Sequence, residues 1–447
     1  MNRESSSSAE SDPPGPSGWP LIGSALESRR ALTFLLENRR EYGEIVSYEF
    51  IDESICQLNH PDDIEWVLVE NSQAFTKSHL TKDVLGPVVG DGLFTSDGDT
   101  WREQRRRIQP AFHPDQIAVY GELMVDAVQR QLSTWDPGDR IEVNEEMRAL
   151  TLDIVARALL GVDVESKIEQ IGHDLDVIFA RLGSVWYHLL PERIPTPGNR
   201  RFDRALSSLE SVVDGIIAER RATPAGDDVV SRLLDPEFMD GEEMSQRQLR
   251  DEVMTFLVAG HETTAQALTF TCYLLATNPD VEARLVEELE DSLGSDAPTV
   301  AAMRDLTYTD RVIREALRLY PPAGDIHREP IDTVEIRGYD IPQGVTISMP
   351  PWVVHRDPRW YDDPDAFQPD RWTDEFRSSL PRLAYFPFGA GPRRCVGERF
   401  ALMEAKIVLA SIYQDVHLEV HSQTTFDVEY EITTRPKHPI WMTVTSR

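Results

Sequence analysis

One short stretch of the chain brings together a cysteine, three glycines and three arginines. It runs from Phe386 to Phe400 and reads FPFGAGPRRCVGERF, with Cys395 between a glycine-rich turn and a helix-like run from residue 396 to about 411. A thiolate placed there is stabilised by the dipole of the following helix and by backbone N–H groups. Glycines also let the backbone approach a flat partner closely. The stretch therefore favours thiolate chemistry against such a partner.

This stretch has two simpler interpretations, of which the first stays open and the second is discounted. A lone cysteine beside a glycine turn is more often a buried structural residue than a reactive one. A phosphate-binding loop would end in Lys-Ser/Thr after a clear strand, and this stretch shows neither. The remaining cysteines, Cys56 and Cys272, are far from Cys395 in sequence, so we expect no disulfide framework and a reducing, cytoplasmic setting.

A second unusual stretch lies in the middle of a long helical pattern over residues 245–277. Its centre reads FLVAGHETTA, in which Gly260 weakens a helix by about 1 kcal/mol and Glu262 brings a charge into an apolar neighbourhood. Thr263 and Thr264 can bond back to helical carbonyls. Locally unfavourable residues in a core helix often mark function. The alternative is that the glycine is merely tolerated and that the polar residues lie on a solvent-facing side of the helix.

Two further patterns, each with charged residues, are candidates for a functional role. Glu315 and Arg318 stand at i and i+3 before Leu-Tyr-Pro-Pro, which ends the helix. Trp101 and Arg105 share one face of a basic helix in an acidic protein. Taken alone, the first is an exposed ion pair and the second an ordinary basic surface helix.

Together these patterns resemble the cytochrome P450 family, the haem-thiolate monooxygenases, of the soluble prokaryotic type. The string Phe388-x-x-Gly391-x-Arg393-x-Cys395-x-Gly397 is similar to the haem-binding signature, and four motifs follow the family's order between residues 20 and 444. The resemblance implies a mainly α fold with small β-sheets. It also implies haem b between the long central helix and the Cys-loop helix, in a single domain over residues 20–447 after a disordered acidic, Ser- and Pro-rich tail over residues 1–19.

The resemblance also implies roles for individual residues. Cys395 would be the axial haem ligand, Thr263 would hydrogen-bond to bound O2, and Glu262 would relay protons. Glu315, Arg318 and Arg371 would form a structural ion cluster. The remaining residues implied to contact haem are Trp101, Arg105, Arg328, Arg393, Phe388, Gly391, Gly397, Ala259 and Gly260, with His327 and His355 as further candidates.

The implied reaction inserts one oxygen atom of O2 into a hydrophobic, lipid-like or terpenoid substrate. The motifs extend to no flavin- or nicotinamide-binding module, so a ferredoxin or flavodoxin with its reductase would supply electrons. Arg102, Arg106 and Arg107 would face such an acidic partner. A peroxygenase or isomerase on the same fold, and a non-catalytic haem carrier or sensor, are the alternatives. The pair Glu262 and Thr263 disfavours both, because neither needs a proton relay.

The composition of the chain limits its possible binding partners and its cellular environment. The net charge is −32, which disfavours nucleic-acid binding. Lysine accounts for only five of the 45 basic residues, and this acidic, lysine-poor composition predicts a protein adapted to concentrated salt. No run of eighteen apolar residues predicts a membrane span, and the N-terminus lacks the plan of a signal peptide. We expect a cytoplasmic monomer.

The elements that must position these residues are mainly helical. Residues 76–98 are expected to form a mostly structureless loop that lines an apolar substrate pocket, together with segments near 175–200, 253–259, 323–326 and 433–436. Strands are predicted in a hairpin over residues 45–58 and over residues 331–336, 339–341, 346–349 and 416–444. Helices are predicted over residues 26–42, 61–71, 99–109, 114–134, 144–160, 167–190, 200–222, 227–234, 245–277, 280–293, 300–305 and 309–320.

Overall fold

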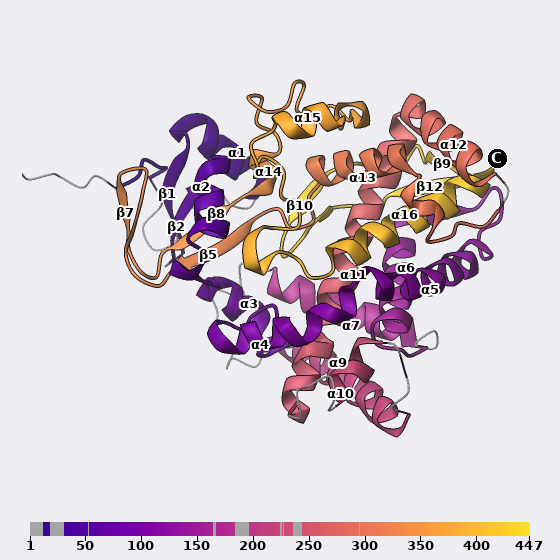
Figure 1. Ribbon diagram of the computed structural model, residues 1–447, viewed down its shortest axis with the longest axis horizontal. Coiled ribbons are helices and arrows are strands. Elements are labelled where there is room, and N and C mark those ends of the chain that lie inside the picture. Colours follow the sequence, from indigo (N-terminus) through magenta and orange to yellow (C-terminus); the bar gives the residue numbers. More distant parts are fainter. Residues whose placement is uncertain are drawn as a thin grey trace, which may run out of the picture.

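The structure is a computed structural model, and helices dominate it, as predicted (Figure 1). It describes residues 12–17, 31–51, 53–163, 167–183, 196–223, 226, 228–235, 244–294 and 296–447. The α-helices are α1 (Ala31–Tyr42), α2 (Pro61–Glu65), α3 (His79–Val89), α4 (Gly98–Ile108), α5 (Pro114–Leu132), α6 (Val143–Ala158), α7 (Ile168–Leu182), α9 (Pro197–Ala222), α10 (Val229–Leu234), α11 (Gln246–Thr277), α12 (Pro279–Leu293), α13 (Thr307–Leu319), α14 (Pro351–Val354), α15 (Asp374–Ser379) and α16 (Glu398–Asp415).

The sheets lie in different parts of the molecule: Figure 1 shows β1, β2, β5, β7 and β8 together at one end, and β9 and β12 at the opposite end. One sheet has the order β1-β2-β8-β5-β3, and β4-β12-β9, β10-β11 and β6-β7 form three smaller sheets in the described part of the chain. The strands are β1 (Ile45–Phe50), β2 (Glu53–Leu58), β3 (Phe75–Thr76), β4 (Arg140–Glu142), β5 (Ile326–Pro330), β6 (Val334–Ile336), β7 (Tyr339–Ile341), β8 (Thr346–Met349), β9 (Val416–Val420), β10 (Val428–Tyr430), β11 (Thr434–Pro436) and β12 (Trp441–Ser446). The register of the β1–β2 hairpin, with Phe50 opposite Glu53, confirms the predicted turn near residues 52–53.

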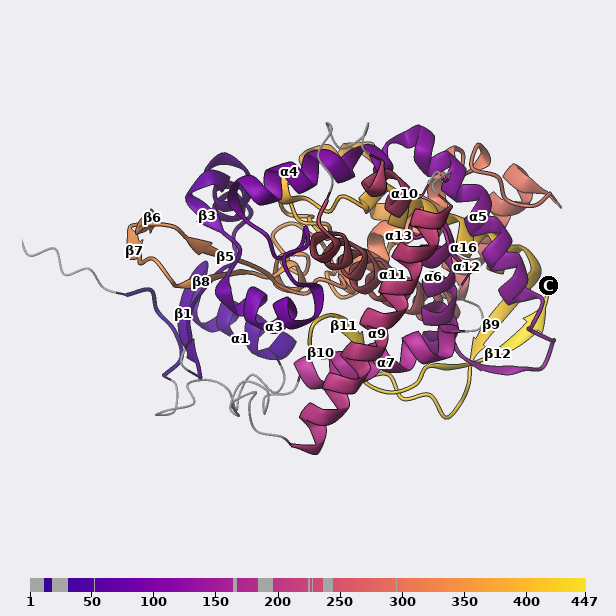
Figure 2. The same ribbon diagram turned by 90° about the horizontal axis from the view of Figure 1, so that it is seen from below.

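Helix α11 runs through the middle of the molecule (Figure 2). The hydroxyl of Ser245 caps its start by accepting from Gln248 N–H at 3.2 Å, and Pro279 begins α12 directly after its end. A Cβ atom at Gly260 would lie 3.1 Å from Cγ2 of Val155, so glycine there lets α6 pack closely on α11. Most of the α11 side chains are buried, as expected for a central helix.

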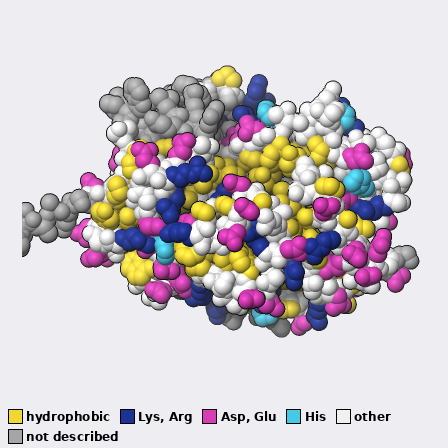
Figure 3. Space-filling view, turned by 90° about the horizontal axis from the view of Figure 1, so that it is seen from above, with side chains coloured by type: hydrophobic (Ala, Val, Ile, Leu, Met, Phe, Trp, Pro, Cys, Tyr) yellow, Lys and Arg dark blue, Asp and Glu magenta, His cyan; other side chains and the backbone are white. Residues whose placement is uncertain are grey.

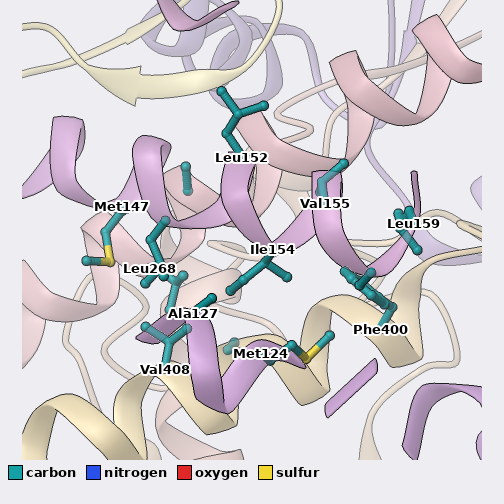
Figure 4. Close-up of a cluster of buried hydrophobic side chains, with 14 of the residues drawn as sticks. Met124, Ala127, Met147, Leu152, Ile154, Val155, Leu159, Leu268, Phe400 and Val408 are labelled. Carbon is teal, nitrogen blue, oxygen red and sulfur yellow. The ribbon is translucent and has the colours of Figure 1, made fainter. Parts of the chain in front are cut away.

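The largest apolar core joins α5, α6, α11 and α16 (Figure 4). Its labelled side chains are Met124, Ala127, Met147, Leu152, Ile154, Val155, Leu159, Leu268, Phe400 and Val408, all at most 3 % exposed. Burial of apolar surface stabilises by roughly 25 cal/mol per Å². Because Phe400 and Val408 lie on α16, this core fixes the helix that directly follows Cys395.

The segment between residues 76 and 98 was predicted wrongly as a structureless loop. It contains α3, whose start is capped by the hydroxyl of Ser78 accepting from Leu80 N–H. Pro87 lies inside this helix, and it is one of the five glycines and prolines in residues 76–98 that suggested a loop. Leu85, Val88 and Val89 are buried in the core against α11, and this packing outweighs the local propensity.

Smaller differences concern the ends and types of elements. The predicted helix over residues 61–71 is α2 followed by a π-helix, η2 (Trp66–Glu70), and residues 300–305 form only a 3-10 turn, η6 (Ala302–Arg304). Strand β5 was not predicted, because its sequence lacks apolar alternation. Parts of the helices predicted over residues 26–42 and 167–190, and most of the predicted tail over residues 1–19, lie outside the described residues. Within residues 12–17, the Pro14 carbonyl accepts from Ser47 N–H at 2.9 Å, so that piece lies against β1.

Charge on the surface is mixed. On the face shown in Figure 3, acidic side chains are spread among basic ones. Among the described residues, no helix is long and apolar enough to cross a membrane.

Candidate active site

Cys395 lies between the 3-10 turn η8 (Gly391–Arg393) and α16, and its side chain is accessible. Its N–H donates to the Phe388 carbonyl at 3.0 Å, and Gly397 N–H donates to its sulfur. Although the side chain is accessible, desolvation by the surrounding protein raises the pKa of the Cys395 thiol, and the charge of Glu398 adds to this rise. The Gly397 N–H and the charges of Arg105 and Arg394 oppose the rise, because they stabilise the thiolate form.

The other two cysteines differ clearly. Cys56 and Cys272 are buried, and burial raises the pKa of each thiol to about 12. Thiols with such pKa values stay protonated and inert at neutral pH. Because its sulfur is accessible, Cys395 is the cysteine suited to ligate a metal.

Glycine at two positions of the cysteine loop is required by the backbone. Gly389 and Gly391 have φ angles of +69° and +68°. A Cβ atom at Gly391 would lie 1.8 Å from the carbonyl oxygen of Leu68, which belongs to η2. The loop can sit on this π-helix only because residue 391 has no side chain. At Gly397 a Cβ atom would lie 3.9 Å from the Cys395 sulfur, in ordinary contact.

The centre of α11 combines an accessible side and a buried side. Ala259 is exposed and Thr263 is half-buried, although the helix around them lies in the core. The hydroxyls of Thr263 and Thr264 donate to the carbonyls of Ala259 and Gly260 at 2.9 and 3.3 Å, as predicted for such residues in a helix. The α-helix nevertheless remains continuous from Gln246 to Thr277.

Glu262 is buried on another side of α11, with a basic group against its carboxylate. Arg148 Nε of α6 lies 3.4 Å from Oε2, and the Gln266 amide donates to Oε1 at 2.9 Å. The hydroxyl of Thr433 lies 3.5 Å from Oε1. Arg148 also pairs with the half-exposed Asp176, so a chain of polar groups runs from Glu262 toward the surface.

Several basic side chains gather beside the cysteine loop. The Arg393 guanidinium lies 4.4 Å above the Trp101 ring and donates to the Ser96 carbonyl at 3.0 Å. Arg328 is buried, and burial, followed by the charge of Arg393, lowers its pKa to about 10. Asp97 is the carboxylate that pairs with Arg393.

Lys77 belongs to this basic cluster and was not predicted. Burial, followed by the charges of Arg328 and Arg393, lowers the pKa of Lys77 well below its usual value. Its ammonium lies 4.0 Å above the ring of Phe94. The sequence did offer one indication of a special role for this residue, because lysine stands at only five positions in a chain whose other basic residues are arginine.

The outer side of α4 forms a shallow basic concavity of about 320 Å³. Its lining residues are Trp101, Arg102, Arg105, Arg106, Gln109, Pro110 and His113. Arg107, which was predicted to face a partner, is instead buried and ion-paired with Glu103. Burial lowers the pKa of Arg105, and the charge of Cys395 opposes that shift, so Arg105 lies close to the thiolate.

The structure brings Glu315, Arg318 and Arg371 together in one cluster, in which Glu315 and Arg318 are fully buried. Arg318 donates to both carboxylate oxygens of Glu315 at 2.8 Å, and Arg371 Nε donates at 3.0 Å. The Trp372 indole and the Gln368 backbone N–H complete the shell at 2.9 and 3.0 Å.

Two histidines that were candidates for haem contact have other partners. His355 is fully buried, accepts from Phe386 N–H at 2.9 Å, and so holds the start of the cysteine loop. Burial, together with Arg318 and Arg356, lowers its pKa well below the usual value. His327 pairs with Asp325 at 3.0 Å.

The charge balance of the site fits a haem group. Lys77, Arg328 and Arg393 lie together, and Asp97, which pairs with Arg393, also pairs with Lys82. Among the described residues this single carboxylate therefore faces several basic groups, and the propionates of a haem would offset the remaining positive charge. An accessible thiol stabilised by an N–H donor suits the iron.

Comparison with known proteins agrees with this geometry. The family model described as Cytochrome P450 matches residues 13–442. The chain is 38 % identical over 403 residues to cyclooctatin synthase of Streptomyces melanosporofaciens, covering 89 % of this chain and 88 % of that protein. It is 32 % identical over 425 residues to pentalenene oxygenase of Streptomyces avermitilis, covering 94 % and 92 %. The crystal structure of the cytochrome P450DA heme domain matches with a TM-score of 0.89 at 28 % identity, covering 98 % of both chains.

Proposed function

Because the chain belongs to the cytochrome P450 family, we propose that Cys395 is the axial ligand of its haem and that its substrate is a terpenoid. Membership makes the protein a haem-thiolate monooxygenase of mainly helical P450 fold. When bound, the haem supplies an iron whose thiolate ligand favours cleavage of the O–O bond, so that one oxygen atom enters the substrate.

The observation that carries the assignment of Cys395 is its accessible sulfur at a backbone N–H donor. Gly397 N–H donates to this sulfur, whereas Cys56 and Cys272 are buried. The basic cluster of Lys77, Arg328 and Arg393 would hold the propionates. Trp101 stacks on Arg393 and Arg105 lies close to Cys395, which supports their predicted roles.

Thr263 and Glu262 would manage protons. The Thr263 hydroxyl lies on the accessible side of α11 and donates to a helical carbonyl, so it can exchange that acceptor for bound O2. Glu262 is oriented by Arg148, which also pairs with the half-exposed Asp176. Since the guanidinium stays protonated, the Glu262 carboxylate is the group there that would accept and release the proton. Positioned acid–base groups typically contribute about 10²–10⁴-fold in rate.

The names of the relatives support the substrate class. Pentalenene oxygenase is named for an oxidation of pentalenene, and cyclooctat-9-en-7-ol 5-monooxygenase, 35 % identical over 410 residues, is named for an oxidation of that alcohol. Apolar side chains of α11 and α3, among them Phe256, Leu257 and Val88, suit such compounds.

An acidic redox protein would dock on the basic concavity of α4. Arg102 and Arg106 are exposed there in a chain whose net charge is −32. A ferredoxin or flavodoxin with its reductase carries the complementary charge and would be steered to this side. The cysteine loop adjoins the same side through Arg105, which shortens the path for electrons.

The absorption spectrum of the dithionite-reduced protein under carbon monoxide tests the assignment. We expect the strongly red-shifted Soret band of thiolate-ligated haem in the wild type and its loss in Cys395→Ser. The Cys272→Ser variant is the matched control and should keep the band. A thiolate-type band in Cys395→Ser would refute the assignment. Titration with cyclic terpenoid hydrocarbons and alcohols should give a spectral shift on binding, and fatty acids binding more tightly would overturn the substrate class.

A further inference from the structure

The segment between α3 and α4, residues 90–97, lies directly against α11, and we call it the connector. At Gly90 a Cβ atom would lie 2.3 Å from Cγ of Asp251, and at Gly92 it would lie 2.1 Å from the hydroxyl of Thr255. Gly90 also has a φ angle of +54°. Glycine at these two positions lets the connector touch the long helix.

Two neighbouring carboxyl groups of α11 hold the connector by its backbone. Asp91 N–H donates to Asp251 Oδ2 at 3.0 Å, and Leu93 N–H donates to Glu252 Oε2 at 3.0 Å. Glu252 is fully buried, and its Oε1 atom has no hydrogen-bond partner among the described residues. A buried carboxyl group with an unpaired oxygen is costly, so its presence calls for a reason.

The far end of the connector holds the cysteine loop. The Ser96 carbonyl accepts from Arg393, and the Asp97 carboxylate pairs with the same guanidinium. Gln104 of α4 braces the two ends of the connector, because it donates to the Asp91 carbonyl at 2.7 Å and bonds to the Ser96 hydroxyl. A continuous set of contacts therefore runs from Glu252 to Arg393.

We propose that Glu252 is a positioning residue for the oxidation: its carboxyl group fixes the connector on α11, and the connector fixes Arg393 beside Cys395. The proposal rests on the proposed role of the cysteine loop. Glu252 also stands at i, i+4, i+7 and i+11 with Phe256, Ala259 and Thr263, on one side of α11. The same helix side thus carries the attachment of the connector and the residues proposed to face bound O2.

The protonation state of Glu252 provides a way to test this attachment. Burial, with the backbone N–H of Leu93 opposing and the charge of Asp251 adding, raises the pKa of Glu252 to about 8. Other charged groups also surround this attachment. Asp251 lies on the same helix and Asp91 on the connector. Burial raises the pKa of Asp251, and the charges of Arg247 and Arg250 oppose this rise. Glu252 is therefore mostly neutral at pH 7 and ionises above pH 8.

Ionisation should loosen the connector by a calculable factor. If the opened carboxyl group has the ordinary pKa of 4.5 and the closed one about 8, the opening equilibrium rises about 10-fold between pH 7 and pH 9. Glutamine at position 252 keeps an acceptor for Leu93 N–H but does not titrate. Leucine at that position removes the acceptor.

Hydrogen exchange of the haem-loaded, full-length protein measures this opening. After correction for intrinsic exchange, we expect connector amides of the wild type to open about 10-fold more at pH 9 than at pH 7, and those of Glu252→Gln to show no such rise. In Glu252→Leu the connector and the cysteine-loop peptide, residues 388–397, should both lose protection at pH 7. Glu404→Gln, which changes another fully buried carboxyl group that lies on α16 beside Thr264, is the matched control, and its connector amides should keep the wild-type profile.

Two outcomes would overturn the proposal. One is a 10-fold rise in the opening of the connector amides of Glu252→Gln between pH 7 and pH 9, equal to that of the wild type. The other is a Glu252→Leu variant whose connector opens while the cysteine loop stays protected. The carbon monoxide spectrum of the same samples at pH 7 tests the proposed haem ligation separately, so failure of the one is distinguishable from failure of the other.

Discussion

Glu315→Gln should be among the most damaging single changes in the chain. The carboxylate is fully buried and accepts five hydrogen bonds, from Arg318, Arg371, Trp372 and the Gln368 backbone. Glutamine has one acceptor oxygen, so its amide N–H₂ group would face donors. It also leaves two guanidinium groups without their counter-charge.

The magnitude follows from these contacts. Whichever way the amide is turned, at least two donors lose their acceptor, and hydrogen bonds to charged groups contribute about 1.5–3 kcal/mol each. Removing one partner of a buried ion pair costs about 3–5 kcal/mol, which agrees with that range. Since domains are stable by only about 5–15 kcal/mol, we expect Glu315→Gln to lose about a fifth or more of the free energy of unfolding.

Denaturant unfolding followed by tryptophan fluorescence measures this loss, and the carbon monoxide spectrum reports how much haem is retained. Asp370→Asn is the matched control, because Asp370 neighbours Arg371 in sequence but makes an exposed ion pair with Arg284. Exposed pairs contribute about 0–1 kcal/mol. If Glu315→Gln changed the free energy of unfolding by no more than Asp370→Asn does, the reasoning on buried charge would be refuted.

Four further predictions follow from the structure. Gly391→Ala should prevent the cysteine loop from seating on η2 and sharply reduce haem incorporation, whereas Gly344→Ala, with a φ angle of +87° but open space around it, should cost only about 1–3 kcal/mol of unfolding free energy; equal effects would contradict the contact argument. His79 bridges Glu53 and Glu329, and although burial opposes this, their hydrogen bonds raise the pKa of His79 above 6.5, so its stabilising effect is complete below pH 6.5 and is lost as pH rises through the folded-state pKa. The difference in stability between wild type and His79→Gln should therefore shrink with rising pH, and a difference that grows would show the sign to be wrong. Thr263→Ala should lower product formed per NAD(P)H consumed at least 10-fold, while undiminished turnover with peroxide alone would favour a peroxygenase. If the acidic, lysine-poor composition reflects adaptation to salt, the thermal midpoint should rise with salt concentration, and full stability in salt-free buffer would exclude that adaptation.

The parts of the site that sequence could predict are those set by residues close together in the chain. The string from Phe388 to Gly397 fixes the surroundings of Cys395 within ten residues, and the Glu315–Arg318 pair spans a single helical turn. Helix α11 was also predicted within one residue at its start, because an apolar pattern of 32 residues leaves little choice.

The remaining parts depend on contacts between distant segments. Helix α3 contains Gly86-Pro87, and only its packing on α11 shows that it is helical. Lys77 joins the basic cluster because β3 pairs with β5 and brings it near Arg328. Arg107 is buried by a fold that the local sequence does not specify, and Glu252 became a candidate only once the connector was seen against it.

The lowered pKa of Lys77 gives the protein a chemical reporter of its own. A lowered pKa leaves more of an amine unprotonated and nucleophilic at a given pH, so an acylating reagent would label Lys77 of cofactor-stripped protein faster than Lys82, Lys406 and Lys437, whose ammonium groups are held in ion pairs. Propionates beside Lys77 would raise its pKa and slow that reaction. In a chain with five lysines, the extent of acylation at this one residue would count the molecules that lack their cofactor.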